Sequence, residues 1–230
     1  MYKSIADYGI IGDIHSVALI SEEASSDYCS MPFIHSPTVF AAILDDEKGG
    51  KFRIYPNSQY HHQEYLVDTN ILSTEFKIPT GTAQLIDFMP IQSNKFFQKV
   101  HLICRSLEML SGNADFVLEL SPRPQYAQMI PKIFRKGSFF QFSTGLETFT
   151  LFFDLKQWRV NGYDNDNLVI FFSLNEGEKA NFSFVYVQGK NKKNSKLPVS
   201  SVRQNKGNLY FYLDRPIASL LNINEKTIRD

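Results

Sequence analysis

Apolar and polar side chains alternate along most of the chain, which is the pattern of half-buried antiparallel strands. Residues 70–78 place apolar side chains on one face and charged or hydroxyl-bearing side chains on the other. A Pro-Thr-Gly turn signal follows at residues 79–81, and the alternation resumes over residues 82–89. These two runs predict a β-hairpin.

A second hairpin is predicted over residues 100–120, where two alternating runs flank Ser111-Gly112-Asn113. Gly and Asn tolerate the positive φ that tight turns need. Further strand-like runs are separated by Gly and Asn turn signals, and they cover residues 138–142, 148–155, 158–160, 168–174 and 180–187. Short strands at this spacing predict antiparallel sheets packed as a β-sandwich.

One short helix interrupts the predicted strands. Ser36 can cap its N-terminus, Pro37 suits the first helical position, residues 38–44 form the body, and Gly49-Gly50 ends it. The expected fold class is therefore all-β, an antiparallel β-sandwich with one short helix.

The composition changes after Gly189. Residues 189–198 are rich in Lys, Asn and Ser, which is typical of a solvated linker. Residues 199–230 contain one strand-like run and a weakly helical end, and their place in the fold stays open. The predicted organisation is a sandwich domain over residues 1–188, a linker over 189–198 and an unplaced tail over 199–230.

Charge and cysteine content narrow the class of protein. Lys+Arg and Asp+Glu number 24 each, and this balance argues against a nucleic-acid partner. Cys29 and Cys104 have no metal-type spacing, so free thiols in a reducing compartment are expected, although a disulfide stays open. The first residues lack a secretory signal and no apolar run approaches a membrane span. A cytoplasmic protein without a membrane partner is expected.

Nothing in the sequence predicts a catalytic residue, a metal site or a cofactor. The carboxylates at residues 45–47 fit a solvated turn. Asp164 and Asp166 resemble a calcium loop, but the Gly and Glu that such a loop needs are absent, so a hairpin loop is favoured. His61 and His62 alternate across a strand and cannot share a metal without a bend.

Four residues are candidates for contact with a substrate or a partner: Asp13, His15, Asp27 and Tyr28. An aromatic ring beside carboxylates suits a carbohydrate, because its C–H groups stack on the ring and its hydroxyls bond the acids. The alternative is that Tyr28 packs at the rim of the sandwich. Trp158 lies in a strand-like run and is expected in the core rather than on a binding platform.

A series of motifs runs in order from residue 5 to about residue 188. It comprises DYGIIGD at 7–13, MPFIHSPTVFAAILDDEKGG at 31–50, RIYP at 53–56, DTNILSTEF at 68–76, LIDFMPI at 85–91 and LSPRPQYA at 120–127. The series resembles the N-terminal domain of family 15 glycoside hydrolases, the bacterial and archaeal glucoamylase-like and trehalase-like proteins. Departures are Ile14-His15 in place of Cys-Arg, Tyr28 in place of Trp, and residues 125–127 in place of Asp-Tyr-Gly.

The resemblance implies a non-catalytic β-sandwich of the supersandwich type that packs against a helical (α/α) barrel catalytic domain. That barrel is missing from the chain or encoded beside it. Parent enzymes hydrolyse α-glucosidic bonds with inversion and use two carboxylates of the barrel. The chain is therefore predicted to be inactive alone, and the parent substrate is α-glucan or trehalose. The alternative is a stand-alone carbohydrate-binding or interaction module. An isolated sandwich is also expected to expose an apolar patch.

Overall fold

Strands make up nearly all the regular structure in the computed structural model, which describes residues 3–56, 60–91, 100–137, 139–160, 167–187, 201–205 and 208–212. The elements in chain order are η1 (Ile5–Asp7), β1 (Tyr8–Gly12), β2 (Val17–Ser21), β3 (Ser25–Ser30), β4 (Thr38–Phe40), β5 (Phe52–Pro56), β6 (Tyr60–Tyr65), β7 (Leu72–Ile78), β8 (Gly81–Phe88), β9 (Val100–Leu120), β10 (Lys132–Lys136), β11 (Phe139–Ser143), β12 (Thr148–Phe153), β13 (Trp158–Val160), β14 (Leu168–Asn175), β15 (Lys179–Val187), β16 (Ser201–Asn205) and β17 (Asn208–Tyr212). The prediction of an all-β, antiparallel fold is confirmed.

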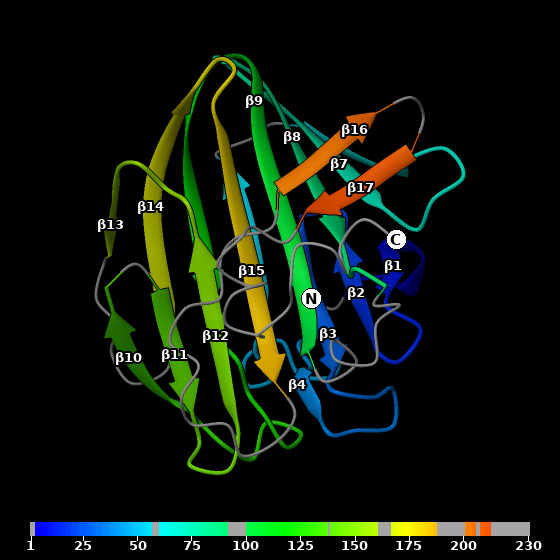
Figure 1. Ribbon diagram of the computed structural model, residues 1–230, viewed down its shortest axis with the longest axis vertical. Coiled ribbons are helices and arrows are strands. Elements are labelled where there is room, and N and C mark those ends of the chain that lie inside the picture. Colours follow the sequence, from blue (N-terminus) through cyan, green and yellow to red (C-terminus); the bar gives the residue numbers. More distant parts are fainter. Residues whose placement is uncertain are drawn as a thin grey trace, which may run out of the picture.

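Among the described residues, fifteen strands form one antiparallel sheet that folds over on itself into two layers (Figure 1). The long strand β9 joins the layers, because its first half pairs with β8 and β15 and its second half pairs with β5 and β14. One layer holds β1 to β5, β13 and β14, and the other holds β6 to β8, β10 to β12 and β15. The remaining pair, β16 and β17, forms a separate two-stranded sheet.

The predicted hairpin over residues 100–120 is wrong, because these residues form the single strand β9. Ser111-Gly112-Asn113 is the point where β9 bends from one layer into the other. Gly112 has a φ of 73°, and a Cβ there would overlap the Thr80 carbonyl. Each half of β9 has strand partners on both edges, so the two halves cannot pair with each other. The first predicted hairpin is confirmed as β7 and β8.

The predicted helix over residues 38–44 is also wrong, because Thr38–Phe40 forms β4 and pairs with β3. Pairing to β3 places Phe40 in the core, where its ring meets Phe184 at a centroid distance of 5.3 Å. A turn follows, in which Asp45 Oδ1 accepts the backbone N–H groups of Glu47 and Lys48. Burial of a whole Phe side chain, worth about 1.5–3 kcal/mol, outweighs the small local preference for a helix. Within the described residues, η1 is the helical element.

The hydrophobic core lies between the two layers. Phe184 of β15 contacts Phe40 and also Phe52 of β5 in the opposite layer. Trp158 packs edge-on against Phe153 at the margin of this core, as the sequence predicts. A second cluster uses residues that alternate with the core-facing ones, and it contains Ile71, Phe88, Leu102, Cys104, Phe139, Phe152 and Val185. These side chains are buried, so they are not the exposed patch expected of an isolated sandwich.

Several predictions fall where no structure is described. The linker at 189–198, the Asp164–Asp166 loop and most of the tail lie outside the described residues. β17 coincides with the strand-like run predicted in the tail.

Candidate functional site

The loop between β1 and β2 carries two of the predicted contact residues, Asp13 and His15. Asp13 is 4% exposed, and its Oδ1 accepts the backbone N–H groups of His15 at 3.0 Å and Ser16 at 2.7 Å. Its Oδ2 lies 3.2 Å from Nδ1 of His101, which stands at the start of β9. The carboxylate therefore fixes both the loop backbone and the imidazole.

His101 completes a buried Asp–His pair that the sequence analysis does not identify. Burial raises the pKa of Asp13, but hydrogen bonds from His101 and from the two backbone N–H groups outweigh burial and hold that pKa below its ordinary value. A carboxylate on Nδ1 selects the tautomer with the proton on Nδ1. Nε2 of His101 is buried and has no hydrogen-bond partner among the described residues.

Aromatic rings surround this imidazole on the side of the loops. The ring of His15 lies 6.1 Å from that of His101, and the ring of Phe33 lies 6.0 Å from it, both edge-on. Phe33 in turn stacks on His35 at 5.4 Å. An Asp–His pair can serve as a general base when a nucleophile is within reach. Here the nearby hydroxyl of Ser16 donates to a backbone carbonyl, so the pair is better explained as a positioning device.

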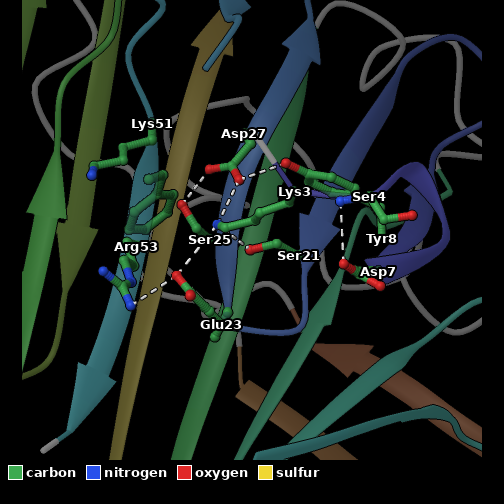
Figure 2. A network of polar contacts seen from close by, with 12 residues as sticks. Lys3, Ser4, Asp7, Tyr8, Ser21, Glu23, Ser25, Asp27, Lys51 and Arg53 are labelled. Atoms are coloured by element: carbon green, nitrogen blue, oxygen red, sulfur yellow. Dashed lines mark hydrogen bonds and ion pairs between the residues drawn. The ribbon is translucent and has the colours of Figure 1, made fainter. Parts of the chain in front are cut away.

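Asp27 lies in β3 at the centre of a different network, shown in Figure 2. Its Oδ2 accepts from Lys3 Nζ at 2.9 Å and from the Tyr8 hydroxyl at 3.0 Å, and its Oδ1 accepts from Ser25 Oγ at 2.5 Å. The pKa of the Tyr8 hydroxyl is raised, mainly by burial and next by the neighbouring Asp27 carboxylate. Lys3 also donates to Ser21. The Asp27 carboxylate thus anchors the N-terminal segment to β3.

The four candidate residues do not converge on one site. Asp13 and His15 follow the end of β1, whereas the Asp27 network contacts Tyr8 at its beginning. The four steps between Tyr8 and Gly12 span about 13 Å at the usual rise per residue. Tyr28 is half-buried and pairs opposite Leu19, and a β-bulge at Asp27 separates this pair from the pairing of Ser26 with Ile20.

A third buried polar centre joins the two layers. Arg105 Nε and Nη2 donate to Asp87 Oδ1 and Oδ2 at 2.7 and 3.0 Å. The same guanidinium donates to the carbonyls of Phe52 at 2.6 Å and Ala24 at 2.7 Å, which belong to the opposite layer. Arg105 and Asp87 are fully buried, and neither was identified as a candidate. Their role is architectural, because the Arg105 guanidinium donates its hydrogen bonds to Asp87 and to two backbone carbonyls.

A groove of about 910 Å³ lies along β5, β9, β13 and β14. Arg53 covers the ring of Tyr55 at 4.2 Å, and Arg159 covers the ring of Phe171 at 5.3 Å. The Tyr55 hydroxyl donates to Glu119 at 2.8 Å. The lining of the groove therefore combines aromatic rings, cations and carboxylates.

Across the described ranges the protein shows neither a metal-binding cluster nor a membrane-spanning helix. No cluster of three or more His, Cys, Asp or Glu side chains there could hold a metal ion. His61 and His62 alternate on β6, and His62 lies 3.8 Å from Glu64 at the surface. Cys29 and Cys104 are buried and not joined in a disulfide, and burial raises the pKa of the Cys29 thiol. No helix in those ranges is long and apolar enough to span a bilayer.

Comparison with known proteins matches most of the sequence to one family. Residues 2–168 match the family described as trehalase-like, N-terminal. A trehalase of Thermoplasma volcanium is 34% identical over 154 residues, which cover 64% of this chain and 24% of the relative. A trehalase of Thermoplasma acidophilum is 38% identical over 136 residues, which cover 56% of this chain and 23% of the relative.

A solved structure of a heparinase III covers 91% of this chain and 42% of its own, with a TM-score of 0.46 and 8% identity. The chain spans about a quarter of the length of the trehalase relatives that it matches. The family match covers well over half of the present sequence. The chain belongs to the family of trehalase-like N-terminal domains.

Proposed function

We propose that the chain is the non-catalytic N-terminal domain of a family 15 glycoside hydrolase and that it packs against a helical barrel catalytic domain. The observation that carries this proposal is the match to trehalase-like N-terminal domains over residues 2–168, together with trehalase relatives about four times as long as the matched part. The parent reaction is inverting hydrolysis of an α-glucosidic bond. The names of the relatives favour trehalose over α-1,4-glucan as the substrate.

The buried carboxylates support a structural role for the domain. An inverting hydrolase needs one carboxylic acid and one carboxylate about 6.5–9.5 Å apart, both facing the substrate. Among the described residues, the buried acids are Asp13, Asp27 and Asp87, and each is held by a side-chain cation or an imidazole. These acids hold the protein together, which supports a structural role for the domain.

Glucose release tests the proposal. The purified 230-residue chain is incubated with trehalose, maltose or soluble starch, alone and with the catalytic part of the Thermoplasma volcanium trehalase. We expect no release by the chain alone, and faster trehalose hydrolysis by the catalytic part when the chain is present. Glucose release by the pure chain, abolished by substitution of one of its own carboxylates, would overturn the proposal.

A second candidate function is stand-alone carbohydrate binding, and the groove along β5, β9, β13 and β14 favours it. Sugar rings stack on aromatic side chains while their hydroxyls bond to charged groups. Retardation of the chain in an amylopectin gel, lost in Tyr55→Ala but kept in the exposed-site variant Leu110→Ala, would support this function. Equal mobility with and without glucan would exclude it for that polymer.

A further inference from the structure

We propose that one end of the sandwich is the surface that docks the catalytic part of a trehalase-like enzyme. This docking end consists of the loops at residues 13–16 and 31–36 with His101 beneath them. The inference rests on the proposed function and adds to it the face of the domain, the residues that make contact and the chemistry of that contact.

Exposed apolar side chains mark the docking end. Ile14 is 82% exposed and Ile34 is 60% exposed, and the Ile34 N–H donates to the His15 carbonyl at 2.7 Å, which ties the two loops together. Between Asp27 and Asp45 the sequence contains no Lys, Arg, Asp or Glu. Exposed apolar residues without neighbouring charge are typical of the centre of a protein interface.

Ile14 is held in a backbone conformation that its side chain disfavours. Its φ is 77°, and a β-branched residue in the left-handed region is a genuine outlier. Asp13 imposes this geometry, because its Oδ1 accepts the backbone N–H groups of His15 and Ser16, which directly follow Ile14. The strain brings no burial in return, since the Ile14 side chain faces solvent. A partner that covers Ile14 would bury its apolar side chain and so offset the cost of the strained backbone.

A rigid floor supports the two isoleucines. Phe33 lies edge-on to His101, which is 1% exposed, and the interplanar angle between the Phe33 and His35 rings is 8°. His101 is fixed in turn by Asp13. His101 is therefore a positioning residue that supports the loops from the core. A pre-organised surface loses little conformational entropy on binding.

The chain leaves the sandwich beside the docking end. In the last strand of the two-layered sheet, Val187 pairs with Val100 and Tyr186 pairs with His101. Figure 1 shows β15 ending at the same end of the molecule as β4. The polypeptide that continues from Val187 therefore starts beside His101, and in the trehalase relatives about three-quarters of the length lies outside the match. This position selects the catalytic part as the occupant.

Binding of the full 230-residue chain to the catalytic part of the Thermoplasma volcanium trehalase tests the inference. Isothermal titration calorimetry compares the wild type with the Ile14→Asp/Ile34→Asp double variant, and thermal unfolding confirms that each protein is folded. The control is Leu110→Asp, an exposed leucine at the bend of β9 that lies nine residues, or about 30 Å, along the strand from His101.

We expect the double variant to weaken binding at least tenfold and Leu110→Asp to change it less than twofold. An Ile14→Asn variant should unfold at a higher temperature, because Asn tolerates the left-handed region, and yet bind more weakly. A higher unfolding temperature together with a lower affinity would show that Ile14 acts in docking and not only in the structure of the loop. Binding that is equal in all variants would overturn the docking end and leave the proposed function standing. No binding by the wild type would overturn both.

Discussion

Replacement of Arg105 by Lys tests whether one guanidinium holds the two layers of the sandwich together. Arg105 makes a bidentate pair with Asp87 inside its own layer, and it donates to the Phe52 and Ala24 carbonyls of the other. A lysine ammonium can keep the charge beside Asp87. It cannot reproduce the planar fork that reaches both carbonyls at the same time.

The expected loss follows from the two carbonyls. A hydrogen bond to a charged group contributes about 1.5 kcal/mol at the lower end of its usual range, so two lost bonds cost about 3 kcal/mol. For a domain of this size that loss lowers the unfolding temperature by about 6–12 °C. Arg105→Met removes the charge as well and leaves Asp87 buried and unpaired, which adds about 3–5 kcal/mol. We expect the Met variant to be largely unfolded.

Urea unfolding followed by circular dichroism measures these losses. The matched control is Arg135→Lys, because Arg135 is exposed on β10 and loses only its contact with the Trp158 ring. We expect the control to change the free energy of unfolding by less than about 1 kcal/mol. A loss below about 1 kcal/mol in Arg105→Lys would refute the reasoning, since it would show that the carbonyls do not depend on the fork.

Three further predictions concern Asp13, the two cysteines and Gly112. Because the pKa of Asp13 is lowered, the Asp13 carboxylate stabilises the fold above the ordinary carboxyl pKa, and this stabilisation disappears as the pH falls through the lowered value. The difference in the free energy of unfolding between the wild type and Asp13→Asn should therefore shrink from pH 6 to pH 2 in urea titrations. A constant difference would contradict this. Cys29 and Cys104 should react with a thiol reagent in urea but not in the native protein, and rapid native labelling of either would show that it is accessible. Gly112→Ala should lower the free energy of unfolding by more than about 2 kcal/mol, because the added Cβ meets a backbone carbonyl. Gly145→Ala, with open space around it, should lower that free energy by only about 1–2 kcal/mol. Equal losses in thermal unfolding would argue against the bend at Gly112.

Alternation within single strands was enough to predict the class of fold and the β7–β8 hairpin. It failed for residues 100–120, because two alternating runs around a glycine look the same in a hairpin and in one long bent strand. The choice is made by partners far away in sequence, such as β5 and β15, which pair with β9 on either side of the bend. The helix over residues 38–44 failed for a related reason, since strand pairing with β3 buries Phe40.

The candidate site was predictable only where its residues are neighbours in sequence. Asp13 and His15 share a loop, so their proximity followed directly. His101 lies 88 residues from Asp13, and no local pattern links them. One signal could have found it, because residue 101 alternates in phase with the core-facing Ile103 and Leu107, and an inward-facing histidine needs a polar partner.

The loop backbone at the docking end does not depend on the side chains that depart from the family motif. Asp13 shapes the loop through backbone N–H groups of the residues after it, and backbone N–H groups are present whatever side chain follows. Ile14 and His15 can therefore replace the Cys-Arg of the family without loss of the loop. Arg105 and Asp87 differ in kind, because their side chains make the contact and cannot change singly. A loop that is fixed through its backbone can therefore present different side chains to a partner, whereas the buried Arg105–Asp87 pair, which joins the two layers, depends on the side chains themselves.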